Sequence, residues 1–456
     1  MKPVILAGLA LSLAIDGASA RGDDFRATAP AIGESPHLVA PSIRATKLAN
    51  GVRILVVERH GGLPIVSLRL VSDVGAFGAE PGVASLAAKS AFRGEHDLLR
   101  SFIETSTLGG IGVGWDGIEV RETCLAPALD SAIGLAWDAA TDGSFHRVYV
   151  NDARDNVRRD REDDRWSARH ALHEELYPKG DPMHDGLWGP PSATESVKPE
   201  ELGAYFARAF APEHVTLVVV GDTTLEAVTE SAKRAMGDAR AWSTPVPVAP
   251  ALTTAPKREL VVVDRPGSTQ STIAIGAIGV PRGSVDAGAL HVLAAAMRRR
   301  LDATLRQRLG LTYGFNATAL EGRARGTIVV EGKVETSHTG ESLKQVLAAI
   351  DGVRAAPLED AELATAKTLC HYLDPRHEET TAAAADALAA LVEAGLPLDA
   401  WPRERAAVDK VTKEDVLRVA RAYLDPAHMP IVIVGDTAAI KGSLADIGGP
   451  VTFTTP

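Results

Sequence analysis

Cysteine is almost absent from this chain of 456 residues, in which Cys124 and Cys370 are the only two. Two cysteines so far apart in sequence make no disulfide framework, and the sequence leaves open whether they meet. No Cys-x-x-Cys pair is present, which excludes zinc ribbons and thioredoxin-type redox sites. Aromatic residues make up only 5% of the chain, whereas alanine is abundant, so we expect helices that pack closely on small side chains.

Positive charge and long apolar runs are also scarce. Lys and Arg number 48 against 59 Asp and Glu, which gives a formal net charge of −11. Binding through nucleic-acid phosphates needs a basic surface, so we expect no nucleic-acid partner. Beyond the N-terminus no apolar run reaches ~18 residues, the length that spans a bilayer, so we expect no transmembrane segment. The Gly-x-Ser-x-Gly, Walker A and Rossmann motifs are absent too.

The N-terminus has the pattern of a secretory signal peptide. Lys2 gives a positive start, residues 4–15 are an apolar run, and Ala18-Ser19-Ala20 offers a small-x-small cleavage site. We predict that residues 1–20 are removed on export and that the mature protein is periplasmic. The alternative is an N-terminal helix of the fold, which Asp16, late in the apolar run, slightly favours.

The chain contains an internal duplication. Residues 197–222 and 411–436 share one pattern at a constant offset: an amphipathic helix, a proline-containing turn, a buried strand and a Gly-Asp stop. An apolar strand opens each copy, Val52–Glu58 in the first and Arg258–Asp264 in the second. Helices and half-buried strands interleave in both copies. We therefore expect an α+β fold of two duplicated sheet-and-helix sandwich domains.

A proline-rich stretch, Trp242–Pro250, separates the two copies. Prolines at that density favour an extended linker. We expect a first domain over residues 43–240, a linker over residues 241–257 and a second domain over residues 258–445.

Several short motifs follow one another along this duplicated chain. They are the Leu48–Gly51 opening, the segment Gly82–Gly94, Gly109-Gly110, Pro212–Thr216 and, in the second copy, Leu305–Tyr313. In this order they resemble one subunit of the pitrilysin/insulinase-type (inverzincin) zinc metallopeptidases. The resemblance covers nearly the whole mature chain and implies one half of a clamshell that closes over an unfolded peptide. Small bacterial members of that family often divide the labour, with zinc on one subunit and an Arg/Tyr pair on its partner.

The zinc motif is where this chain departs from the family it resembles. The family's zinc helix carries His-x-x-Glu-His, whereas the matching positions here hold Ser85, Ala88 and Lys89. Serine is a poor zinc ligand, lysine brings a positive charge toward a dication, and alanine cannot act as a base. The family's downstream glutamate falls near Asp160–Glu162, in a charged run (158–164) typical of a solvated helix face. We expect no zinc bound by this chain.

The second-copy motif is retained, because Leu305–Tyr313 is similar to the family's Leu-Arg-Glu-x-x-Gly-Leu-x-Tyr. The resemblance implies that Arg306 and Tyr313 bind the substrate backbone. A planar guanidinium and a phenol can both hydrogen-bond peptide carbonyls. The alternative is a simple turn into a strand, with Tyr313 half-buried.

A competing signal lies at His170, His173 and Glu174, whose spacings of three and four place them on one helix face. Such a face can hold a metal and would make the chain an active peptidase. The simpler interpretation is an exposed polar face on an outer helix.

The predicted function is therefore the non-catalytic, substrate-binding subunit of a periplasmic zinc metallopeptidase heterodimer. Its partners would be a homologous subunit that carries the zinc and a peptide or unfolded-protein substrate. A catalytically inert peptide-binding or scaffold protein of the cell envelope is the alternative.

Overall fold

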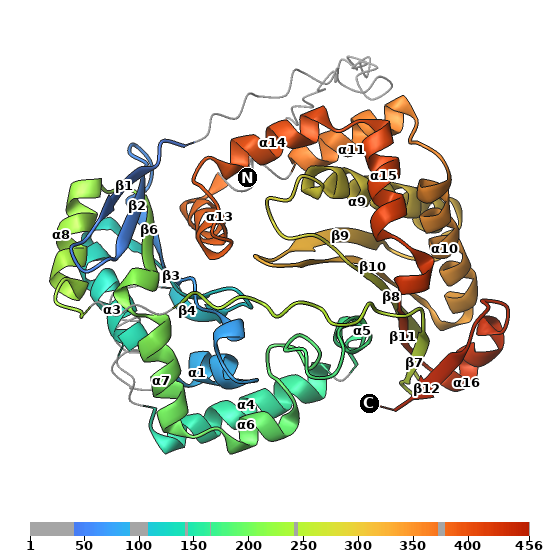
Figure 1. The fold of residues 1–456 in the computed structure, drawn as a ribbon, viewed down its shortest axis with the longest axis horizontal. Coiled ribbons are helices and arrows are strands. Elements are labelled where there is room, and N and C mark those ends of the chain that lie inside the picture. The colour runs from blue at the N-terminus through green and yellow to red at the C-terminus, as the bar shows by residue number, and fades with distance from the viewer. Residues whose placement is uncertain are drawn as a thin grey trace, which may run out of the picture. The chain divides into compact units, whose positions relative to one another are not determined.

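Two six-stranded sheets form the framework of the chain (Figure 1). The computed structural model describes residues 41–91, 108–141, 145–164, 166–240, 245–372 and 379–455. The first sheet has the order β1 (Arg44–Lys47), β2 (Arg53–Glu58), β6 (Val215–Gly221), β3 (Ile65–Ser72), β5 (Ile118–Leu125) and β4 (Leu108–Val113). The second has the order β12 (Val451–Thr454), β7 (Leu260–Asp264), β11 (Ile431–Gly435), β8 (Gln270–Ile278), β10 (Gly326–Glu335) and β9 (Phe315–Glu321).

The two sheets repeat one topology, which confirms the predicted α+β duplication. The equivalent pairs β2–β6 and β7–β11 are parallel, and β3 and β8 run antiparallel beside β6 and β11. The sheets differ at one edge. There β1 comes from the start of the first domain, whereas β12 follows the second domain and lies beyond residue 445.

Helices cover one face of each sheet from within the same copy. In the first copy the core is shared with α1 (Val83–Ala91), α3 (Leu129–Thr141), α4 (Arg147–Asp164), α7 (Pro199–Ala209) and α8 (Leu225–Met236). In the second it is shared with α9 (Ala287–Leu301), α10 (Thr339–Ala355), α11 (Asp360–Tyr372), α14 (Ala400–Lys410), α15 (Lys413–Tyr423) and α16 (Thr437–Ile440). Two further helices, α5 (Ala168–Leu176) and α13 (Thr381–Glu393), cover the opposite faces.

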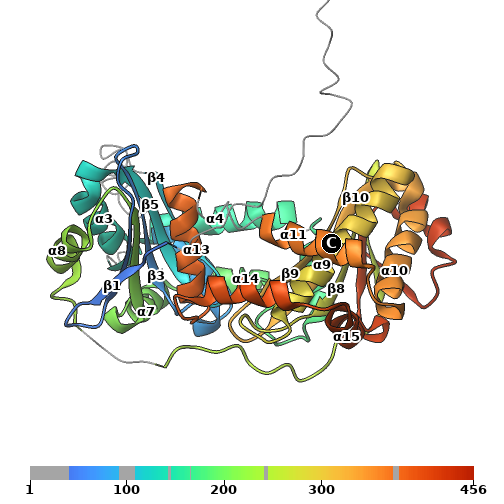
Figure 2. The same ribbon diagram turned by 90° about the horizontal axis from the view of Figure 1, so that it is seen from above.

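These two covering helices are exchanged between the copies. Helix α13 of the second copy packs on β3 and β6 of the first sheet (Figure 1), and Figure 2 shows α13 beside β3. Helix α5 of the first copy packs on β8 and β11 of the second sheet (Figure 1). Strand β6 shows why both faces need cover, since Leu217 points into one core and Val218 into the other. A strand buried on both faces reads as a continuous apolar run. Residues 40–456 accordingly form one compact unit.

Small residues allow the close approach that the alanine-rich composition suggested. Helix α13 packs on the first sheet with three buried alanines, Ala384, Ala385 and Ala389, among its core residues. On the second sheet, a Cβ added to Gly276 would lie within 3 Å of Leu172 and Leu176 of α5. The close approach of the exchanged helices therefore depends on small residues at these particular positions.

A clasp at the tip of the β9–β10 hairpin ties the two copies together. The guanidinium of Arg323 donates to the carbonyl oxygens of Asp73, Asp116 and Glu393. Beside it, Arg325 forms a two-point ion pair with Asp181, with N–O distances of 2.6 and 2.8 Å. Both side chains of that pair are almost wholly buried, at 8% and 4% exposure. We call Arg323 and Arg325 the hairpin clasp.

Several predicted features lie outside the described residues. They are the signal peptide (1–20), the last three residues of the Gly82–Gly94 segment and the start of the linker (241–244). The described linker residues, 245–257, form neither helix nor strand. Cys124 and Cys370 are not joined to each other in a disulfide. Among the described helices, none combines the length and the apolar character that a membrane span requires.

Glu122 of β5 is an unusual core residue. Its side chain is fully buried among Leu68, Val120 and Cys124, and neither carboxyl oxygen has a hydrogen-bond partner among the described residues. Burial raises the pKa of Glu122 to about 9, and burial followed by the nearby Glu122 raises the pKa of the Cys124 thiol to about 11. Glu122 is therefore a neutral acid at pH 7.

Replacing Glu122 by Gln is expected to flatten the pH dependence of stability. A carboxyl whose pKa is raised from 4.5 to about 9 on folding stabilises the native state fully below pH 4.5. That contribution is lost progressively as the pH rises through 9, whereas an amide does not titrate. Melting temperatures measured at pH 5, 7 and 9.5 should fall more steeply with rising pH for the wild type than for Glu122→Gln. The exposed Glu200→Gln serves as the control, and parallel profiles for all three proteins would contradict the assignment.

Candidate functional site

The zinc-motif positions lie on α1, which begins directly after Gly82. Gly82 has a φ of +79°, and a Cβ at this position would lie 2.6 Å from the carbonyl oxygen of Trp188. Only glycine tolerates both the left-handed backbone and this approach. The segment around Leu187 and Trp188 thereby lies directly against the start of α1.

Two of the three motif positions are filled by buried, non-ligating groups. The Ser85 hydroxyl is buried and donates to the carbonyl oxygen of Leu187 at 2.7 Å. Ala88 is buried in the first hydrophobic core and has no polar side-chain atom. A neutral serine hydroxyl is a poor zinc ligand, and Ala88 has no donor atom at all.

Lys89, at the third position, forms an ion pair with Asp160 of α4. Its Nζ lies 2.5 Å from Asp160 Oδ2 and 5.0 Å from the centroid of the Trp188 ring, a cation–π distance. Asp160 belongs to the stretch that matches the family's downstream glutamate. The ammonium thus lies beside Asp160, and each of the two groups neutralises the charge of the other.

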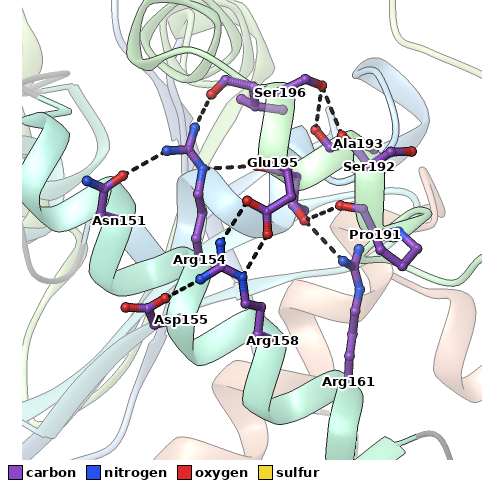
Figure 3. A network of polar contacts seen from close by, with 12 residues as sticks. Asn151, Arg154, Asp155, Arg158, Arg161, Pro191, Ser192, Ala193, Glu195 and Ser196 are labelled. Atoms are coloured by element: carbon purple, nitrogen blue, oxygen red, sulfur yellow. Dashed lines mark hydrogen bonds and ion pairs between the residues drawn. The ribbon is translucent and has the colours of Figure 1, made fainter.

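A row of arginines on α4 holds the segment that lies against α1 (Figure 3). Arg158 pairs through two nitrogens with Glu195 of α6 (Pro191–Ser196), and Arg154 donates to the carbonyl oxygens of Thr194 and Val197. Arg161 donates to the carbonyl oxygens of residues 188–190. The expectation of a solvated face over residues 158–164 agrees with Arg158, which is 55% exposed. It is wrong at Arg161, whose side chain is partly buried against the carbonyl oxygens of residues 188–190.

The donor set at α1 does not fit zinc. Zinc sites in proteins use imidazole, thiolate or carboxylate ligands in a fixed array. Here the positions hold a donating hydroxyl, a methyl group and an ammonium ion, and the neighbouring Asp160 is already paired with that ammonium. No group of three or more His, Cys, Asp or Glu side chains in the described part of the chain is arranged to hold a metal.

Substituting Lys89 by Met should reduce the free energy of unfolding by about 1 kcal/mol, because partly exposed ion pairs and cation–π contacts are each weak. The side chains of Lys89 and Asp160 are 33% and 43% exposed. Urea unfolding of Lys89→Met would measure the change, with Lys233→Met, in an exposed pair with Glu230, as the matched control. A loss of more than about 3 kcal/mol would instead identify a desolvated structural ion pair.

Arg306 lies on a π-helical turn, Asp302–Arg308, that continues directly from α9. π-Helical turns are rare in proteins, but those that occur are often found at functional sites. Leu305 anchors the turn in the core, and the Arg306 side chain is 58% exposed. Its guanidinium lies 3.5 Å from Asp302 Oδ1, so most of its N–H donors face solvent.

Tyr313 follows at the apex of the loop into β9 and is 92% exposed. The expectation of a half-buried tyrosine, under the alternative of a simple turn, is therefore wrong. Tyrosine rings are enriched at binding surfaces, where the ring supplies contact area and the hydroxyl a hydrogen bond. The structure places both motif residues on the surface but assigns no contact between them.

The candidate metal ligands His170, His173 and Glu174 lie in surroundings that differ from those expected. Helix α5 is not an outer helix, because Leu172 and Leu176 pack on the second sheet. Burial, followed by the charges of His170 and Arg169, lowers the pKa of His173 to about 4. The His173 ring packs edge-on against Tyr177, while His170 lies 3.8 Å from Glu174. The three side chains therefore serve packing and helix-surface contacts.

Each sheet ends in an edge strand close to one of the two motifs. Strand β4 ends the first sheet and contacts α1, and β9 ends the second sheet directly after Tyr313. Gly110 of β4 has open space around its Cα, with no atom within 4 Å of an added Cβ. An edge strand presents unpaired N–H and C=O groups that an extended peptide can pair with.

Some contacts at the site are not predictable from the sequence. The sequence places Asp160 near the lost glutamate but does not identify it as the partner of Lys89, and it predicts a solvated Arg161. Asp302 lies 3.5 Å from the Arg306 guanidinium, and Thr312 accepts from the backbone N–H of Gly314 beside Tyr313; neither carries a signal beyond its closeness in sequence. One signal was available. Where a lysine replaces a metal ligand, its charge needs a partner, and a carboxylate near the other ligand positions in the sequence is a candidate for that partner.

Comparison with known families gives one match. Residues 196–370 match the sequence profile of a family described as "Peptidase M16 inactive domain". No curated protein matches the sequence.

Solved structures share the fold over most of the chain. A peptidase M16 inactive domain from Pseudomonas fluorescens has a TM-score of 0.75 and 21% identity, covering 87% of this chain and 98% of that one. A protease from Helicobacter pylori has a TM-score of 0.75 and 16% identity, covering 86% and 99%. The first half of the periplasmic protease PqqL from Escherichia coli has a TM-score of 0.71 and 13% identity, covering 89% and 94%.

Proposed function

We propose, starting from the premise that this chain is an M16 peptidase-like protein with an inactive domain, that it is the substrate-binding subunit of a zinc metallopeptidase heterodimer. M16 is the family that the sequence resemblance indicated. The chain would supply Arg306 and Tyr313 to a composite site, and a homologous partner would supply the zinc. The reaction would be hydrolysis of a peptide bond by a metal-activated water held on that partner.

One contrast carries the proposal. The α1 positions hold Ser85, Ala88 and the Lys89–Asp160 pair, which cannot bind zinc, while Arg306 and Tyr313 are exposed at the head of an edge strand. The chain therefore lacks zinc-binding residues at α1 but has the Arg/Tyr pair that would bind the substrate. A division of labour between two subunits accounts for both halves of this contrast.

The edge strands suggest how the peptide would bind. An extended segment can add to β9, where main-chain hydrogen bonds give affinity without sequence preference. Arg306 and Tyr313 would then donate to carbonyl oxygens of the peptide near one end of that strand. A guanidinium offers five N–H donors in a planar fork, and a phenol offers one O–H. These groups bind backbone, which suits an unfolded substrate.

The location and the partner are part of the same proposal. The signal-peptide pattern of residues 1–20 supports export to the periplasm. One of the fold relatives is described as a periplasmic protease. The partner would be a zinc-bearing homologue, for which the neighbouring reading frame is the first candidate.

Reconstitution tests the proposal. The chain and the zinc-bearing homologue from the neighbouring reading frame are purified separately and together, and hydrolysis of fluorescein-labelled α-casein is measured. We expect neither protein alone to reach the rate of the mixture, and size-exclusion chromatography with light scattering to show a 1:1 complex. The mixture should lose activity with a chelator and regain it with zinc.

Other outcomes separate the alternatives. If the homologue binds this chain yet hydrolyses casein equally well without it, the composite site is wrong and the inert scaffold is favoured. If no complex forms but this chain alone binds casein, the chain is a peptide-binding protein without a catalytic role.

A further inference from the structure

Tyr313 is presented by a loop that is anchored on both sides. Leu311 and Phe315, two residues before and after it, are buried in the core of the second copy. The Phe315 ring lies over Gly332 of β10, where an added Cβ would be 2.5 Å from the ring. Gly310, with a φ of +67°, turns the chain out of the π-helical segment toward Leu311. The exposure of Tyr313 is therefore imposed by its neighbours in the chain.

The Thr312 hydroxyl completes this anchoring. It donates to the carbonyl oxygen of Lys333 on β10 at 2.6 Å and accepts from the backbone N–H of Gly314 at 3.1 Å. One hydroxyl thus connects the residues on either side of Tyr313 to the neighbouring strand. Valine has the same shape but can make neither bond, whereas serine can make both.

Asp302 has a similar place beneath Arg306. The π-helical spacing brings Gln307 over Asp302, and its amide nitrogen donates to Asp302 Oδ2 at 2.9 Å. The other oxygen lies 3.5 Å from the Arg306 guanidinium. The carboxylate therefore holds Gln307 and contacts Arg306 through one nitrogen, which orients the guanidinium and leaves its remaining donors available.

We propose that Thr312 and Asp302 are positioning residues that fix Tyr313 and Arg306 for binding of an extended peptide. This inference rests on the proposed function, because it assigns to the Arg/Tyr motif two supporting residues of its own. Prior fixation lowers the entropy lost on binding, since the loop is already in its bound conformation. Thr312 acts through Tyr313, so its effect should vanish when Tyr313 is gone.

A double-mutant cycle tests the inference on the full chain. The probe is fluorescein-labelled, reduced and carboxymethylated α-casein, and binding is measured by fluorescence anisotropy. Thr312→Val should weaken binding about threefold to tenfold, the range for loss of the one neutral hydrogen bond that Tyr313 would donate to the peptide, and Thr312→Ser should restore binding. In the Tyr313→Ala background, Thr312→Val should have no further effect. Asp302→Ala should weaken binding about twofold, and Arg306→Ala should mask that effect in the same way.

The outcomes distinguish failure of the inference from failure of the proposed function. If wild type binds casein and Tyr313→Ala weakens it, but Thr312→Val binds like wild type, the positioning role is overturned. The role is also overturned if Thr312→Val weakens binding equally in both backgrounds, because that pattern identifies a general structural effect. If wild type does not bind casein, or Tyr313→Ala binds equally well, the proposed function itself is overturned. Melting temperatures of all variants show whether folding contributes.

Discussion

Changing Arg306 to Ala and Tyr313 to Phe together should lower kcat/KM of the reconstituted heterodimer by about 100-fold. A hydrogen bond from a charged donor contributes about 1.5–3 kcal/mol and one from a neutral donor about 0.5–1.5 kcal/mol, and every 1.4 kcal/mol is a factor of ten. Both side chains are exposed and make few contacts within the chain. Their replacement should therefore leave the melting temperature unchanged.

Arg308→Ala provides the matched control for this experiment. Arg308 lies on the same π-helical turn and is exposed, but it occupies an unspecified (x) position of the Leu-Arg-Glu-x-x-Gly-Leu-x-Tyr motif. It should leave kcat/KM within about twofold of wild type. Equal activity of the double variant and wild type would exclude Arg306 and Tyr313 from the composite site. Equal losses of kcat/KM for the double variant and Arg308→Ala would show that the loss of positive charge alone causes the effect.

Arg325→Met should destabilise the protein more than Lys89→Met or Glu122→Gln. It leaves Asp181 as a buried carboxylate without its partner, a change that costs about 3–5 kcal/mol in proteins. The substitution also removes the guanidinium from the face of the Tyr177 ring, 4.9 Å from its centroid. Since the hairpin clasp joins the two copies, we expect faster amide exchange both in the β9–β10 hairpin and around Asp181. Calorimetry and hydrogen exchange would measure the two effects.

Two variants show whether the unpaired Asp181 carboxylate is the cause. Arg325→Met combined with Asp181→Asn should recover part of the loss, because the stranded charge is removed. The exposed Arg299→Met should change stability by less than about 0.5 kcal/mol. A loss for Arg325→Met as small as that of Arg299→Met would show that the clasp contributes nothing to the joining of the copies.

The duplicated α+β fold could be predicted because its signals are local. Buried strands such as Val215–Gly221 and Ile431–Gly435 read as continuous apolar runs, and the capping box of Thr412 and Asp415 marks a helix start in the sequence itself. The same pattern occurs twice at a fixed offset, so one copy supports the interpretation of the other.

The exchange of α5 and α13 could not be predicted in this way. Periodicity shows that a helix has an apolar face, but it does not show which sheet that face covers. For α5 the visible polar residues, His170 and Glu174, suggested an exposed helix, while Leu172 and Leu176 decide its burial. The contacts of the hairpin clasp could not be predicted for the same reason. Arginines in a hairpin turn, such as Arg323 and Arg325, are expected to be solvated, and their partners Asp116 and Asp181 are distant in sequence.

At the site, the sequence predicted which groups are present but not what they contact. It showed that Ser85, Ala88 and Lys89 are unsuited to zinc, since ligand chemistry depends on residue type alone. It did not show that Lys89 pairs with Asp160, 71 positions away, or that Arg161 holds the carbonyls beside them. Those contacts require the packing of α1 against α4 and the 187–195 segment.

The central claim is that this chain carries no zinc chemistry of its own. The most direct test is to equilibrate the purified chain with zinc, remove free metal by dialysis, and measure bound zinc by mass spectrometry together with casein hydrolysis. We predict no stoichiometric zinc and no chelator-sensitive hydrolysis. One zinc per chain with chelator-sensitive hydrolysis, both lost in His173→Ala, would contradict the account and establish the chain as an active peptidase.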